Sequence, residues 1–144
     1  MKILEILTPK RVLGTLGERS AAKYLRKNKY KILKMNYVTD GHEIDIIAKC
    51  KDVTAFIEVK TRTVGKEDPR EIRPAASVDK KKQQSIIEAA RGYLSQNRTE
   101  TKKRFDIIEV YVSGSGKKKR VVDIRHLINT FNINTAYPPK KFDK

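Results

Sequence analysis

The chain has 144 residues, the length of one ordinary domain, and 38% of them are hydrophobic, which is enough for a single core. Its 33 Lys and Arg outnumber 17 Asp and Glu, and this net charge of +16 favours a polyanionic partner, nucleic acid first. No apolar run approaches the roughly 18 residues of a membrane span. The single cysteine, Cys50, excludes an intramolecular disulfide and a cysteine-based zinc cluster, which fits a reducing cytoplasm.

The N-terminal third predicts a helix and then a strand. Residues 1–13 form a lead-in, and a helix is expected from Gly14 to about Asn28, where apolar residues such as Ala21 and Leu25 recur at helical spacing. Residues 30–37 alternate like a strand. A turn at residues 39–41 then leads the chain into the next segment.

Two adjacent stretches, residues 42–48 and 56–62, read as the strands of a hairpin. If Lys51 and Asp52 are the turn residues, Asp45 falls opposite Glu58, where like charges would repel each other. A divalent metal between them would convert the repulsion into coordination. Lys60 projects from the same face because it lies two residues beyond Glu58. Two acids and a lysine on one face can cut a phosphodiester bond.

The same pattern also fits a hairpin with a solvated charged face. In that interpretation Lys60 neutralises Glu58 or pairs with Glu43, and no metal is involved. The register is the critical assumption, because a slip of one residue would turn these side chains to opposite faces.

The rest of the chain predicts a second helix and further strands. A loop from Thr63 to about Val78 precedes a helix that Asp79 caps and that ends near Asn97. Residues 104–113 form a clear strand, a turn follows, and residues 119–124 form a short strand. Residues 125–131 are expected to form a last helical turn or two, before a basic, frayed tail at residues 132–144.

These elements follow the order α-β-β-β-α-β-β, which predicts an α/β fold with a mixed central sheet flanked by helices. Residues 14–131 would form the single domain. Within it lie Gly17-Glu18, the Glu43–Ala48 and Phe56–Arg62 strands, Lys82-Gln83 and Arg104-Phe105-Asp106. In this order the set resembles the YraN-like proteins (UPF0102) of the restriction-endonuclease-like superfamily, which also holds the archaeal Holliday-junction resolvases.

The resemblance implies a restriction-endonuclease-like core with a PD-(D/E)xK site that uses Mg²⁺ or Mn²⁺. Asp45, Glu58 and the backbone carbonyl of Val59 would bind the metal, with Glu18 completing the acidic shell. Lys60 would orient or deprotonate the attacking water or stabilise the phosphate. Residues expected to bind nucleic acid are Arg62, Lys82, Gln83 and the basic hairpin tip Lys117, Lys118, Lys119 and Arg120.

Each of these roles has a structural alternative. Glu18 could serve only the dipole of its helix, and Glu43 could replace one of the acidic ligands or pair with Lys60. Asp106 could be a more remote acid of the site, although a hydrogen-bonding role at the edge of the core fits it better. The lysines at residues 80–82 could be a solvated helix face.

The sequence therefore predicts a metal-dependent endonuclease that hydrolyses structured or branched DNA, like a Holliday-junction resolvase. DNA is favoured over RNA, and a two-fold junction would need a homodimer. The alternative is a non-catalytic nucleic-acid-binding module on a nuclease-derived fold.

Overall fold

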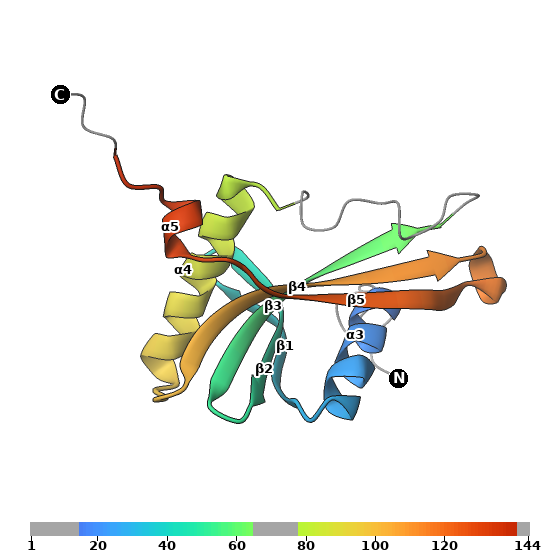
Figure 1. Ribbon diagram of the computed structural model, residues 1–144, viewed down its shortest axis with the longest axis horizontal. Coiled ribbons are helices and arrows are strands. Elements are labelled where there is room, and N and C mark those ends of the chain that lie inside the picture. Colours follow the sequence, from blue (N-terminus) through green and yellow to red (C-terminus); the bar gives the residue numbers. More distant parts are fainter. Residues whose placement is uncertain (1–14, 65–77, 141–144) are drawn as a thin grey trace.

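The computed structural model describes residues 15–64 and 78–140. The expected α/β fold is confirmed: a mixed five-stranded sheet with flanking helices, in the expected order (Figure 1). In chain order the elements are α3 (Leu16–Lys27), β1 (Lys31–Thr39), β2 (His42–Cys50), β3 (Val53–Thr63), α4 (Lys80–Gln96), β4 (Lys102–Ser113), the 3-10 turn η2 (Gly116–Lys118), β5 (Arg120–Phe131) and α5 (Ile133–Ala136).

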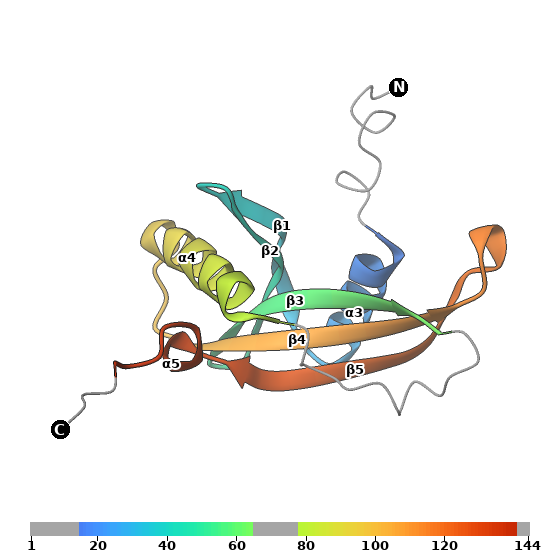
Figure 2. The ribbon, with the colours of Figure 1, turned by 90° about the horizontal axis from the view of Figure 1, so that it is seen from above.

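The strands lie in the sheet in the order of the sequence, β1-β2-β3-β4-β5. Only β3 and β4 run parallel, because α4 forms the crossover between them, and the other neighbours are antiparallel. The predicted hairpin register is confirmed: Cys50 pairs with Val53, and the ladder continues to Ile46 opposite Ile57. Figure 2 shows β3, β4 and β5 running side by side along the molecule.

Helices cover both faces of the sheet, and the sheet separates two apolar cores. On one face α4 packs its Ile86 and Ala90 against Phe56 and Ile107. On the other face α3 packs against a second apolar cluster that includes Ile57. Alternate side chains of β3 therefore point to different helices, and the face shared with α4 also carries Glu58 and Lys60.

A glycine lets α3 approach β3 closely. A Cβ atom at Gly17 would lie only 1.9 Å from the side-chain oxygen of Thr61. The absence of a side chain therefore brings the first turn of α3, which carries Glu18, onto the strand that carries Glu58. The Gly-Glu pair of the sequence thus has a packing reason of its own.

The helical turn expected at residues 125–131 is wrong, because β5 continues as a strand to Phe131. Its register against β4 shifts between Phe105 and Ile107, which pair with Phe131 and Leu127. Asn129 takes a positive φ of 56° in this bulge. The extra residues give Leu127 and Phe131 a spacing of four that imitates a helix but arises from a bulged strand.

The start of the tail is ordered, contrary to the expectation of fraying. Asn132 caps the short α5, whose Ala136 is fully buried, and α5 packs against α4. The lead-in at residues 1–13, most of the loop predicted after Thr63, and the last four residues of the tail lie outside the described residues.

Candidate active site

Asp45 and Glu58 meet where the β2–β3 ladder ends. The last backbone pair is Ile46 with Ile57, and one step further the backbone N–H of Val59 donates to Asp45 Oδ2 at 2.8 Å. The Asp45 side chain therefore takes the place of a backbone acceptor. Ile44 and Ile46 belong to the cores on opposite faces, so β2 departs from regular alternation at this point. Asp45 and Glu58 therefore lie close together, as predicted. They meet through the irregularity in β2 and not as a regular cross-strand pair.

Burial destabilises the ionised forms of both carboxyl groups. Burial and the nearby charge of Glu58 raise the pKa of Asp45 to about 8, against the lowering effect of the Val59 hydrogen bond. Burial also raises the pKa of Glu58, although Lys82 and Lys60 counteract it. Such paired, raised carboxyl pKa values are typical of functional sites, because a stable core has no need for them.

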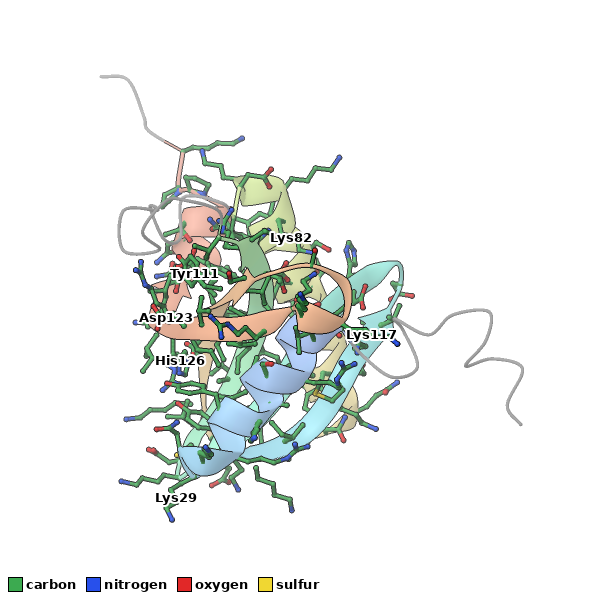
Figure 3. The ribbon with its side chains drawn as sticks, turned by 90° about the vertical axis from the view of Figure 1, so that its right-hand side faces the viewer. Lys29, Lys82, Tyr111, Lys117, Asp123 and His126 are labelled. Atoms are coloured by element: carbon green, nitrogen blue, oxygen red, sulfur yellow. The ribbon has the colours of Figure 1, made fainter. Side chains whose placement is uncertain are left out.

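Two lysines approach Glu58 from different elements. Lys60 Nζ lies 3.9 Å from Glu58 Oε1, and Lys82 Nζ lies 3.8 Å from Glu58 Oε2. Asp79 caps α4 by accepting from the Lys82 backbone N–H at 2.8 Å, which fixes the first helical turn beside the sheet. Figure 3 shows Lys82 on α4, above the strands of the sheet. The crossover helix thus adds a cation to the hairpin site.

Glu18 serves its own helix in this structure. Its Oε2 accepts from the Thr15 backbone N–H at 3.4 Å and from Asn36 Nδ2 at 3.3 Å. In turn the Glu18 backbone N–H donates to the Thr15 hydroxyl oxygen, which completes the cap of α3. It still lies close enough for its charge to raise the pKa of Asp45. The capping alternative is therefore present, and the ligand role of Glu18 stays a prediction.

Among the residues that the structure describes, no three His, Cys, Asp or Glu side chains converge into a complete metal site. The arrangement still fits Mg²⁺, which proteins often hold by one or two carboxylates while water and substrate phosphate fill the other positions. Glu58 Oε2 is buried and has no hydrogen-bond partner within the described chain. Because the N–H and C=O of a strand residue face the same edge, we expect the Val59 carbonyl on the side of β3 where its N–H meets Asp45. These donors suit a hard cation.

The other predicted residues divide into near and remote groups. Arg62 lies further along the same face of β3, with its Nε 3.7 Å from Glu109 Oε2. Gln83 is engaged elsewhere, since its amide donates to the Val78 carbonyl and its oxygen accepts from Thr135. The basic tip lies at the end of the molecule opposite α4 (Figure 1), and its residues Lys117, Lys118, Lys119 and Arg120 are exposed.

The alternatives for Glu43 and Asp106 have different outcomes. In the described part of the chain Lys60 pairs with Glu58 and makes no ion pair with Glu43, whose charge instead raises the pKa of Glu58. Asp106 has the hydrogen-bonding role: it is fully buried and binds Arg104, His126 and the backbone of the β5 bulge. His126 is thus a structural partner of Asp106.

Sequence reasoning missed Glu109, Tyr111 and Arg125, which adjoin Arg62. Glu109 is fully buried in β4, and the Tyr111 hydroxyl donates to it at 3.1 Å. The available signal was an acid inside an otherwise apolar strand, because a carboxylate in such a place needs partners from other elements.

The fold and the site define the class of this protein: an α/β protein with a paired-carboxylate and lysine site at the junction of a hairpin and a crossover helix. The family model described as "Uncharacterised protein family UPF0102" matches residues 17–110, and the chain belongs to that family. This confirms the family expected from the sequence.

Curated relatives match along nearly their whole length. A UPF0102 protein of Caldanaerobacter subterraneus is 41% identical over 123 residues, covering 85% of this chain and 96% of the relative. One from Acetivibrio thermocellus is 39% identical over 125 residues (85% and 92%), and one from Chlorobaculum parvum is 44% identical over 124 residues (84% and 92%). None of the helices in the described ranges is long and apolar enough to cross a membrane.

Proposed function

We propose that this protein is a metal-dependent endonuclease that hydrolyses phosphodiester bonds in structured or branched DNA. The observation that carries the proposal is the Asp45–Glu58 pair: burial raises both carboxyl pKa values, the charge of Glu58 adds to the rise at Asp45, and two lysines face Glu58. A site that disfavours its own charges in the free protein is suited to a cation and a polyanion that arrive together.

The residues divide the chemistry between them. Asp45, Glu58 and the Val59 carbonyl would hold Mg²⁺ or Mn²⁺, which lowers the pKa of bound water and neutralises charge on the phosphate. Lys60, with 28% of its side chain exposed, is near enough to orient the attacking water or to bind a phosphate oxygen. Lys82 enters from α4 and supplies a second cation for the substrate. Glu18 could reach the metal if it released its helix cap.

The charge of +16 supports nucleic acid as the substrate, and a protein that reads phosphates and shape has no need of a separate base-reading domain. The proposal favours DNA over RNA, a cytoplasmic site of action, and a homodimer where the substrate is a two-fold junction.

One observation favours a second candidate, a nucleic-acid-binding module without turnover. Lys60 and Lys82 already lie within 4 Å of Glu58, so they can neutralise it without a metal. In that case basic charge would explain binding and the acids would only organise the lysines.

The decisive experiment is a cleavage panel with metal titration. Labelled four-way junctions, flaps and duplexes are incubated with the full chain in Mg²⁺ or Mn²⁺, beside Glu58→Gln, Lys60→Gln and the double variant. Glu100→Gln serves as the control, because it removes an exposed acid outside the site. We expect cleavage by the wild type and the control only. Cleavage that persists in the double variant would point to a contaminant and would overturn the proposal.

Calorimetry separates the two candidate functions. Mn²⁺ binding that disappears in Asp45→Asn and Glu58→Gln is expected of the nuclease. DNA binding without any metal binding at these acids would instead establish the non-catalytic module.

A further inference from the structure

The polar face of β3 continues across two more strands. In the parallel ladder Lys60 lies beside Glu109 and Arg62 lies beside Tyr111, and β5 then places Arg125 beside Glu109. Since alternate residues share a face, these side chains lie on the same side of the sheet as Glu58. The next row of β5 adds Asp123, opposite Tyr111 (Figure 3).

Glu109 is the unusual member of this band. It is fully buried, yet its Oε2 has no hydrogen-bond partner among the described residues, and Arg62 Nε, 3.7 Å away, is likewise buried and without one. A buried charge pair with incomplete hydrogen bonds is often less stabilising than apolar residues of the same size. A contribution to stability therefore does not explain a buried acid at position 109. A role in holding Arg62 in place does explain it.

Arg125 approaches the same point from β5. Its guanidinium carbon lies 4.9 Å from the centre of the Tyr111 ring, and its Nε lies 3.4 Å from Asp123 Oδ2. The charges of Arg62 and Arg125 both act on the Tyr111 hydroxyl, where they oppose the rise in its pKa. The two guanidinium groups therefore converge on Tyr111 from opposite sides.

Each arginine has its Nε beside a carboxylate and its terminal guanidinium nitrogens free of such a partner among the described residues. In each case the Nε faces a carboxylate, Glu109 for Arg62 and Asp123 for Arg125. Among the described residues, their terminal nitrogens form no hydrogen bond or ion pair, and 30% of the Arg62 side chain and 20% of the Arg125 side chain are exposed. Paired terminal nitrogens of arginine match the oxygens of a phosphate group.

We propose that Arg62 and Arg125 form a phosphate-binding site for the nucleic-acid backbone, in which Glu109 and Tyr111 act as positioning residues. The site lies one row beyond Lys60, and two residues along a strand cover roughly 6.6 Å, which is of the order of one nucleotide step. It binds a phosphate next to the one that Lys60 would contact. This inference rests on the proposed function for its substrate, although the binding itself requires no metal.

The test measures DNA binding by the full chain in EDTA. Fluorescence anisotropy of a labelled four-way junction and of a short duplex is recorded over a series of salt concentrations. The variants are Arg62→Gln, Arg125→Gln and Glu109→Gln. The control for the arginines is Arg98→Gln, an exposed arginine just beyond the far end of α4.

Each arginine that neutralises one phosphate contributes about 0.9 to the slope of log affinity against log salt. We expect Arg62→Gln and Arg125→Gln each to lower that slope by about this amount, with a loss of affinity of about three- to tenfold. Arg98→Gln should leave the slope unchanged. If the two site variants behave like Arg98→Gln, the inference is overturned.

Glu109→Gln distinguishes positioning from simple charge. Removing an acid makes the protein more basic, so a residue without a positioning role should leave binding equal or tighter, as expected of the exposed control Glu100→Gln. We expect Glu109→Gln to bind DNA about two- to threefold more weakly, because Arg62 loses the carboxylate that orients its guanidinium group. Equal or tighter binding in Glu109→Gln would refute the positioning role. Circular dichroism and a thermal melt verify folding, and the arginine variants decide the case if Glu109→Gln is unfolded.

The outcomes also separate this inference from the nuclease proposal. Arginine-dependent binding without cleavage in any metal would retain the phosphate site and reject the nuclease. Cleavage and binding that are both insensitive to Arg62 and Arg125 would retain the nuclease and reject the phosphate site.

Discussion

Asp45→Asn should make the metal-free protein more stable while it removes the proposed activity. Asparagine retains the shape of aspartate and an oxygen that can accept from the Val59 N–H, which lies 2.8 Å from Asp45 Oδ2 in the wild type. It removes the ionisation that burial and Glu58 oppose. The substitution therefore isolates the electrostatic cost of the site.

The magnitude follows from the pKa of Asp45, which rises from 3.8 to about 8 on folding. A raised carboxyl pKa means that the folded state holds its proton after the unfolded state has released it. The stability of the wild type therefore falls as pH rises from about 4 to about 8, by about 1.4 kcal/mol per pH unit at most. At neutral pH the full cost is about 4 kcal/mol, and partial exposure of Asp45 reduces it to roughly 1–3 kcal/mol.

The assay is urea unfolding in EDTA at about pH 5.5 and at about pH 8, at constant ionic strength. Relative to the wild type, Asp45→Asn should gain more stability at the higher pH. Asp52→Asn is the matched control, since Asp52 lies in the exposed turn of the same hairpin and should show no such gain. Added Mn²⁺ should stabilise the wild type and leave Asp45→Asn unchanged.

The reasoning would be refuted by an equal gain at both pH values, or by a variant less stable than the wild type at the higher pH. Either result would mean that Asp45 is not destabilised by its charge in the folded state. The case for a site that needs a cation would then lose its physical basis.

Three further predictions concern the surroundings of the site. Gly17→Ala should lower the free energy of unfolding by about 1–3 kcal/mol in urea, because the new Cβ would meet the Thr61 hydroxyl. The pKa of Asp106 is lowered by its hydrogen bonds, so the stability that it adds is lost as pH falls below about 4; Asp106→Asn should lose that acid-sensitive part in urea titrations. Lys82→Gln removes a cation 3.8 Å from Glu58, so it should bind Mn²⁺ at least as tightly in calorimetry but DNA about two- to fivefold more weakly in anisotropy.

The hairpin was predictable because two short-range signals agree. Alternating apolar and polar residues define both strands, and Lys51 and Asp52 form a two-residue turn in which Lys51 takes a positive φ of 54°. A turn of fixed length sets the register as far as Ile46 and Ile57, and the irregularity of β2 next to that pair brings Asp45 close to Glu58. The approach of α3 was predictable only through the family resemblance, since the contact of Gly17 with Thr61 joins distant segments.

What the sequence could not reveal depends on long-range partners. The bulge of β5 is fixed by the Asp106 carboxylate, which accepts from the Asn129 N–H at 2.9 Å across the strand pair. The local sequence at residues 125–131 gives no sign of that distant acceptor, so it favours a helix. Glu109 is a similar case, because β4 is buried on both faces and only the neighbouring strand shows which partner its acid meets.

The parallel pairing of β3 and β4 has a consequence for how this protein can vary. Lys60 and Arg62 meet Glu109 and Tyr111 at a constant offset along one ladder, although the crossover through α4 separates them in the sequence. Insertions before or after α4 leave that offset between side chains in space intact, whereas one residue inserted within β3 turns its whole polar row to the opposite face. The connections can therefore diverge in length among relatives, while the two strands must keep their count residue by residue.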